Sequence, residues 1–139
     1  MGFEYVAYQG LETGERQRCS HVVRNGEIVY VFVSPLNPGD KEMAEHLDKH
    51  GDGVKDVAFC VDDAAGIYKK AVERGAVSVH EPKETSDENG SVIMASVKTY
   101  GDTIHTFVQR VNYKGPFLPG FKKHHMKEVL NELLPVPGL

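Results

Sequence analysis

The stretch VKDVAFCVDDAAGIYKKAVERG, residues 54–75, joins a strand pattern to a helix pattern and decides the fold. Its first eight residues form two alternating sets that are both largely apolar, which is typical of a strand covered on both faces of its sheet. Asp62 or Asp63 can then cap a helix that ends at Gly75. We expect the longest helix of the chain near residues 64–74, packed on the outer face of a sheet.

Asp56 interrupts one of the two apolar faces of this strand. A carboxylate that is buried without a partner costs several kcal/mol, so a chain that keeps one there must compensate it. The sequence therefore predicts a polar or cationic partner for Asp56 inside the sheet.

Further strand patterns stand on both sides of this stretch. After it come AVSVHEP, SVIMASVKTY and DTIHTFVQRV, with the polar segment KETSDENG expected as a loop between the first two. Before it come an extended segment at residues 3–8, two strands joined by Asn25 and Gly26, and a helix from Lys41 to about His50. The order strand, helix, strand, strand, strand over residues 54–111 indicates an α+β domain with a largely antiparallel sheet.

The first part of the chain offers only three strands, without a leading strand and helix. If both parts are copies of one unit, the first copy is truncated at its opening. We therefore expect one domain over residues 1–111, with its second unit at residues 54–111. Residues 112–139 are rich in Pro, Gly and aromatic residues and are expected to form a linker or docking arm.

Composition limits the classes of function. With 139 residues, 26% charged and 40% hydrophobic, the chain has the make-up of a globular protein. A net charge of -4 without a basic cluster argues against nucleic acid as a partner, and no apolar run is long enough for a membrane span. The N-terminus does not resemble a signal peptide, and Cys19 and Cys60 stand far apart. We expect a cytoplasmic protein with reduced thiols.

Several motifs of the chain carry a resemblance to a known family. The β-α-β-β-β order, used twice to form a cupped sheet, resembles the vicinal oxygen chelate superfamily. More narrowly, the chain resembles the N-terminal half of the 4-hydroxyphenylpyruvate dioxygenase family, through GLETGER, LNPGDKEMAEHLDKHGDGVKDVAF, VERGA, TYGDTIHTFVQR and NYKGPFLPGF. These blocks occur in the family's order and cover essentially the whole chain.

The resemblance implies an enzyme of tyrosine and phenylalanine breakdown that converts 4-hydroxyphenylpyruvate and oxygen to homogentisate and carbon dioxide. It also implies that Fe(II) is held by two His and one Glu of a C-terminal catalytic half. We expect this segment to be a non-catalytic portion that binds no iron by itself and packs against that half, in a homo-oligomer.

By the same resemblance, Asp56 stands where the catalytic half has a ligand His, and His105 stands where it has a ligand Glu. The first and last strands of such a unit lie side by side, so these two residues are expected to meet inside the cup as vestigial ligand positions. A hydrogen-bonded core pair is the preferred interpretation, and a residual divalent-metal site completed by water is the alternative.

Two other functions stay open at this point. One is a stand-alone metalloenzyme of the same superfamily, of the glyoxalase or lyase type, with a site assembled across a dimer. The other is a metal-free module that uses the cup to hold a small ligand. No catalytic or cofactor-binding residue is assigned.

The remaining candidates are interpreted as ordinary strand, helix or tail residues. They are Cys19 with His21 on one strand face, His46 with His50 on a helix surface, and His124, His125 and Glu128 in the polar tail.

Overall fold

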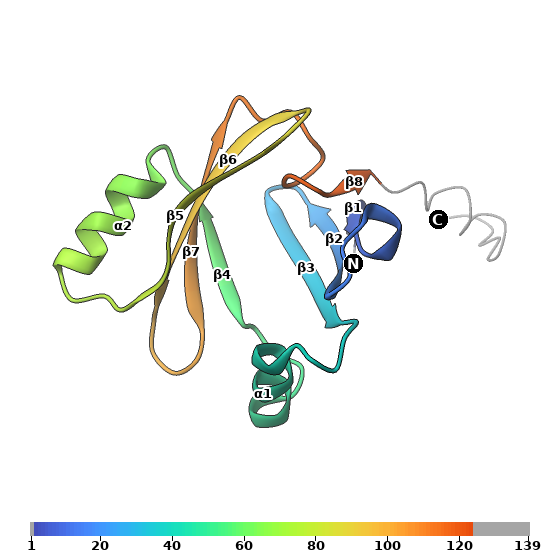
Figure 1. Ribbon diagram of the computed structural model, residues 1–139. Helices are drawn as coiled ribbons and strands as arrows, with labels where there is room; N and C mark the ends of the chain where they lie inside the picture. The colour runs from blue at the N-terminus through green and yellow to red at the C-terminus, as the bar shows by residue number, and fades with distance from the viewer. Residues whose placement is uncertain (1, 124–139) are drawn as a thin grey trace, which may run out of the picture. The chain divides into compact units, whose positions relative to one another are not determined.

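The computed structural model describes residues 2–123 (Figure 1). It contains eight strands, two α-helices and one short 3-10 helix in this part of the chain. In chain order these are β1 (Glu4–Gln9), η1 (Leu11–Thr13), β2 (Arg18–Asn25), β3 (Ile28–Pro35), α1 (Lys41–His50), β4 (Asp56–Cys60), α2 (Ala64–Glu73), β5 (Ser78–Asp87), β6 (Gly90–Lys98), β7 (Ile104–Val111) and β8 (Lys122–Lys123).

The chain forms two compact units. Unit 1 combines residues 1–37 with the segment that starts at Gly120, and unit 2 is the continuous segment 38–119. The expected domain over residues 1–111 stays a prediction; β8, which comes from the expected arm, belongs to the sheet of unit 1. The rest of the expected docking arm, residues 124–139, lies outside the described residues.

Unit 2 contains the predicted β-α-β-β-β arrangement. Its sheet has the order β4-β7-β6-β5, and only the β4–β7 pair is parallel. The first and last strands of the unit are therefore neighbours, as expected. Helix α2 packs mainly on β6 and also on β5 and β7, and Figure 1 shows it lying along one side of this sheet. The α+β fold class and the largely antiparallel sheet are confirmed.

Local signals place α2 where the sequence predicted it. The Asp63 side chain accepts a hydrogen bond from the Gly66 backbone N–H at 2.8 Å, which satisfies a free donor of the first turn. Ala64 is fully buried, and its backbone N–H donates to the side chain of Gln109 on β7 at 3.0 Å. The sheet face that carries Gln109 is therefore the face toward α2. Gly75 follows the helix with φ 99°, a conformation that favours glycine.

The hairpin of β5 and β6 differs from the prediction. The polar segment expected as a loop is mostly strand, because β5 continues to Asp87. Strand β5 lies at the sheet edge, where both of its faces can stay polar, so hydrophobicity does not distinguish it from a loop. Gly90 has φ 125°, and a Cβ there would lie 2.7 Å from the Asn112 carbonyl oxygen. The close passage of the backbone after β7 therefore requires glycine at this position.

Unit 1 is a four-stranded antiparallel sheet with the order β3-β2-β1-β8. The β2–β3 loop is the two-residue turn Gly26–Glu27, one residue later than the Asn25–Gly26 pair that signalled it. Among the described residues of unit 1, the buried side chains are those of Ala7, Ser20, Val22 and Phe121.

The described part of unit 1 contains three strands that match those of unit 2. Strands β1, β2 and β3 repeat the consecutive antiparallel order of β5, β6 and β7. Within residues 2–123, no strand of this sheet lies beyond β3, where β4 would have its equivalent. No α-helix of unit 1 is present in the described residues to match α2.

Candidate functional site

Asp56, at the start of β4, is bonded to a short polar chain that crosses the sheet of unit 2. The Thr106 hydroxyl donates to the Asp56 carboxylate at 2.6 Å. The hydroxyls of Thr106 and Ser96 share a second hydrogen bond of 2.8 Å. Thr106 and Ser96 are 8% and 4% exposed, so this row of hydrogen-bonded side chains links β4, β7 and β6 below the surface.

The electrostatics of Asp56 follow from this environment. Desolvation raises the pKa of the Asp56 carboxyl, while the Thr106 hydrogen bond and the nearby His105 and Lys55 act in the opposite direction. Desolvation of the carboxyl is only partial, because β4 is an edge strand and the residue as a whole keeps exposed surface. The expected coverage of β4 on both faces is therefore wrong: Val57 and Phe59 are 38% and 47% exposed.

The expected direct pairing of Asp56 with His105 is also wrong. In the parallel register, Asp56 lies opposite Ile104 and Val57 lies opposite His105. Paired residues share a face and successive residues alternate, so the carboxylate and the imidazole point to opposite faces of the sheet. His105 Nδ1 instead lies 3.2 Å from the Val57 carbonyl oxygen, and the ring centroids of His105 and Phe59 are 5.2 Å apart.

The donor set at Asp56 does not suit a metal ion. Fe(II) oxygenases use two imidazoles and one carboxylate on adjacent positions, whereas Asp56 has hydroxyl neighbours. Among residues 2–123, no three His, Cys, Asp or Glu side chains are grouped so that they could hold a metal ion. The vestigial role of Asp56 and His105 stays a prediction from the resemblance.

A second polar cluster joins α1 to the β6–β7 turn in unit 2. Asp102 accepts hydrogen bonds from Lys49 Nζ at 2.5 Å and from His50 Nε2 at 2.8 Å. These bonds lower the pKa of Asp102 to about 2. The imidazoles of His46 and His50 lie 4.8 Å apart between ring centroids. His50 is exposed, as expected for this helix surface, and with Lys49 it attaches α1 to the turn, whereas His46 contacts the ring of His50.

The cavity beside this cluster has a volume of about 220 Å³. His46 Nε2 is buried there without a hydrogen-bond partner, and desolvation lowers the pKa of this imidazole. A neutral ring facing a small cavity is a stable arrangement and requires no ligand. The predicted tail set of His124, His125 and Glu128 lies outside the described residues.

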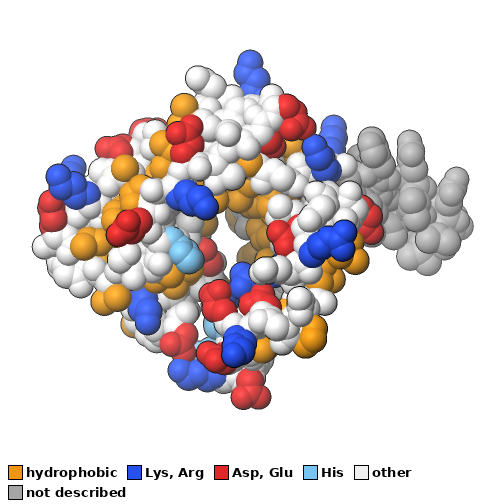
Figure 2. Space-filling model, viewed as in Figure 1, with side chains coloured by type: hydrophobic (Ala, Val, Ile, Leu, Met, Phe, Trp, Pro, Cys, Tyr) orange, Lys and Arg blue, Asp and Glu red, His pale blue; other side chains and the backbone are white. Residues whose placement is uncertain are grey.

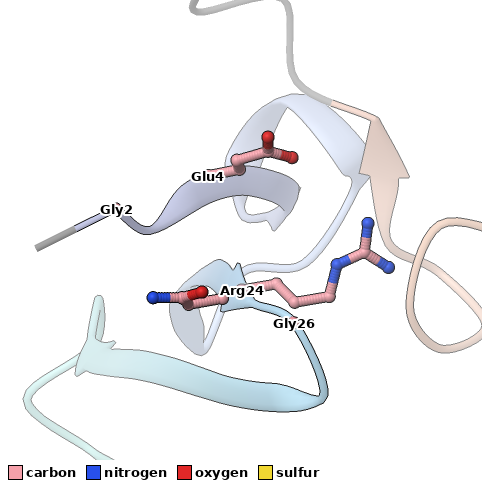
Figure 3. Close-up of a pocket in the computed structure, with 5 residues that line it drawn as sticks. Gly2, Glu4, Arg24 and Gly26 are labelled. Carbon is pink, nitrogen blue, oxygen red and sulfur yellow. The ribbon is translucent and has the colours of Figure 1, made fainter.

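The other cavity, of about 200 Å³, opens in unit 1 between the start of β1 and the β2–β3 turn (Figure 3). Glu4 and Arg24 line it together with Gly2, Asn25 and Gly26. Figure 3 shows the side chains of Glu4 and Arg24 extending from neighbouring strands toward the same side of the view. No ion pair between them is assigned, and this small cavity is given no binding role.

The charged side chains form no extended field on the face that Figure 2 shows, where Lys and Arg alternate with Asp and Glu. Among the described residues, no helix has the length and apolar character of a membrane span.

Comparison with known proteins gives the family. The family model described as hydroxyphenylpyruvate dioxygenase, HPPD, N-terminal, matches residues 1–118. The chain belongs to this family. Curated relatives named 4-hydroxyphenylpyruvate dioxygenase are 53% identical in Tetrahymena thermophila and 55% identical in Danio rerio, each over 96% of this chain. The chain spans only 34% of the length of either relative.

Two solved structures are similar to this chain. A mutant of 4-hydroxymandelate synthase from Streptomyces coelicolor aligns over 90% of this chain and 35% of its own, with a TM-score of 0.76 and 30% identity. Methylmalonyl-CoA epimerase from Mycobacterium tuberculosis aligns over 79% of this chain and 73% of its own, with a TM-score of 0.61 and 16% identity. The second likeness shows the fold alone.

Proposed function

We propose that this chain is the N-terminal portion of a 4-hydroxyphenylpyruvate dioxygenase and takes no direct part in its chemistry. The whole enzyme would convert 4-hydroxyphenylpyruvate and oxygen to homogentisate and carbon dioxide, with Fe(II) held by its C-terminal half. The observation that carries the proposal is the combination of family membership with the hydroxyl-lined surroundings of Asp56.

The residues of unit 2 support a structural role. The hydrogen bond between Ser96 and Thr106 and the one from Thr106 to Asp56 link strands β6, β7 and β4. His105 is placed against a backbone carbonyl and an aromatic ring rather than beside Asp56. Residues 112–139 would then connect this portion to the catalytic half and dock against it or against a second subunit, within a cytoplasmic homo-oligomer.

A chimera tests whether the chain can serve in this role. The region of the Danio rerio relative that aligns with this chain is replaced by the chain itself, and homogentisate formation is measured. We expect the chimera to form homogentisate, and a control lacking this region altogether to be inactive because its catalytic half has lost its packing partner. An inactive chimera that folds and holds iron would contradict the proposal.

The role of Asp56 and His105 is tested in the same chimera. Asp56→Asn and His105→Gln should leave the iron content of the purified protein unchanged, since neither side chain is a ligand. Metal analysis by mass spectrometry gives the readout. Loss of about one iron per subunit in either folded variant would show that the segment does contribute a ligand.

The isolated chain is expected to be inactive. Purified protein incubated with Fe(II) and 4-hydroxyphenylpyruvate should neither consume oxygen nor form homogentisate, because its described residues offer no three-ligand group. Formation of homogentisate by the chain alone would overturn the assignment to a non-catalytic portion.

A further inference from the structure

A cysteine, a histidine and two tyrosines share one face of the sheet in unit 1. Cys19 and His21 lie two residues apart on β2, which pairs with β1 on one side and with β3 on the other. On β1, Tyr5 lies opposite Val23 and Tyr8 lies opposite His21. A register shift between Tyr5 and Ala7 leaves one residue unpaired, so both tyrosines point to the face of His21.

The side chains on this face form a continuous set of contacts. Cys19 Sγ lies 3.2 Å from His21 Nε2, and the Tyr5 hydroxyl is hydrogen-bonded to the other ring nitrogen, His21 Nδ1. The ring centroids of Tyr8 and His21 are 5.2 Å apart, and the Tyr8 hydroxyl donates to the Glu12 carboxylate. This bond raises the pKa of Tyr8, and desolvation raises that of Tyr5, so both hydroxyls stay neutral at physiological pH.

A nucleophile, a base within hydrogen-bond reach of it, and a third group that orients the base are the parts of an activated thiol site. Cys19, His21 and Tyr5 occupy these three positions. When Nδ1–H of His21 donates to the Tyr5 oxygen, Nε2 carries the lone pair and can accept the proton of the Cys19 thiol. The same Tyr5 oxygen then stabilises the imidazolium that forms.

We propose that Cys19 is a nucleophilic thiol site for small α,β-unsaturated carbonyl compounds that carry an aromatic ring. The proton of Sγ passes to Nε2 of His21, and the thiolate sulfur attacks the β-carbon of the electrophile. An S–C bond forms, the electron pair of the C=C bond moves to the α-carbon, and the α-carbon takes the proton back from His21. The product is a thioether, and no oxidant or further reactant is required.

The neighbouring surface favours an aromatic electrophile. Phe32 lies opposite His21 and Tyr30 lies opposite Val23, so both β3 rings belong to the face of Cys19. Tyr30 contacts Phe32 and Phe3, with ring centroids 6.3 Å and 5.4 Å apart. Phe32 is 61% exposed, so its ring can contact a second aromatic ring from solution.

Cys60 provides an internal control. This second thiol is exposed and accepts a hydrogen bond from the Arg110 guanidinium at 3.0 Å. Both cysteines are free, so one incubation labels both under the same conditions.

The test uses the 139-residue chain and the enone 4-phenyl-3-buten-2-one as the probe, with labelling of each cysteine peptide followed by mass spectrometry. At pH 7, Cys19 should react roughly tenfold faster than Cys60, as expected for assistance by a positioned base. This ratio should fall with 3-penten-2-one, which lacks the ring. Equal rates at the two cysteines would overturn the proposal.

Variants separate base assistance from simple exposure. His21→Gln should lower the Cys19 rate roughly tenfold and leave the Cys60 rate unchanged, and Tyr5→Phe should lower it less, because the ring then loses only its orienting partner. The advantage of Cys19 should also shrink above about pH 9, where thiols ionise without a base. If His21→Gln does not fold by circular dichroism, Tyr5→Phe and the pH profile decide the matter. A Cys19 rate that keeps its advantage in folded variants, or at every pH, would contradict the role of His21.

Discussion

Strands β3 and β7 are the last strands of the two similar antiparallel runs β1–β3 and β5–β7, and their surroundings differ. Strand β7 lies between β4 and β6, and its residues Thr106 and Val108 are 8% and 7% exposed. Among residues 2–123, strand β3 pairs with β2 alone, and every large apolar residue from Ile28 to Val33 is exposed by more than a third. The two strands differ in pairing: β4 covers the outer edge of β7, whereas within residues 2–123 no strand pairs with the outer edge of β3.

The free edge of β3 also lacks the usual protection of an edge strand. Natural sheets place charges, prolines or bulges on open edges to prevent pairing with other chains. Strand β3 has no charged residue, its register with β2 is regular, and its only proline is the final Pro35. Edge strand β5 of unit 2, by contrast, carries charged residues along its length and two register irregularities.

The largest expected effect comes from a charge placed on each last strand. Val108→Asp on β7 should lower the free energy of unfolding by about 3 kcal/mol or more, because the carboxylate would be buried without a partner. Val31→Asp on β3, where the native valine is 39% exposed, should cost about 1 kcal/mol or less and should reduce aggregation. Urea denaturation measures both variants. Equal losses of unfolding free energy in the two variants would mean that β3 is buried in solution to the same degree as β7.

A smaller effect is expected at the contact between β4 and β7, which unit 1 lacks. Thr106→Val removes the hydroxyl bonded to both Asp56 and Ser96, so it should cost about 1–3 kcal/mol in urea denaturation. Thr85→Val on edge strand β5 is the matched control and should change stability by about 0.5 kcal/mol or less. Unchanged stability of the Thr106→Val variant would show that the hydrogen bonds among Ser96, Thr106 and Asp56 do not hold β4 in the sheet.

The smallest effect concerns pH. Burial raises the folded-state pKa of Asp56 above its unfolded value, so the folded protein binds this proton more tightly. The contribution of Asp56 to stability is therefore most favourable below the unfolded pKa and is lost as the pH rises through the folded pKa. Asp102 has the opposite sign: its pKa of about 2 means that its contribution is lost as the pH falls from about 4 toward 2.

Urea midpoints of the wild type, Asp56→Asn and Asp102→Asn between pH 2 and 6 measure both signs. The stability of Asp56→Asn should rise relative to that of the wild type as the pH rises above about 4. In acid, Asp102→Asn should lose less stability than the wild type. Parallel curves for all three proteins would show that neither carboxyl titrates differently in the folded state.

Some of this structure could be read from the sequence because local chemistry determines it. Helix α1 begins and ends where Asp40 and Gly51 predicted, since a cap side chain and a glycine act on adjacent backbone groups. The β-α-β-β-β order of unit 2 follows from periodicity and was also found. The polar edge strand β5 was missed in part, because an exposed strand and a loop can have the same composition.

The site could not be read in the same way, because it depends on pairing between strands. The partner of Asp56 is Thr106 rather than His105, and a shift of one residue in a parallel register decides between them. The hydrogen bond between His21 and Tyr5 requires the unpaired residue in β1, which reverses the alternation that the sequence suggests. Neither register leaves a signal in the composition of one strand.

The return of the chain to unit 1 at β8 sets an order of events during synthesis. A ribosome releases β1, β2 and β3 first, then the whole of residues 38–119, and only afterwards Lys122 and Lys123, which pair with β1. Because unit 2 is continuous in the chain, the nascent polypeptide can complete it while unit 1 still lacks Phe121 from its core and β8 from its edge. Strands β1, β2 and β3 are thus synthesised before unit 2, but their sheet is completed only after unit 2, when β8 pairs with β1.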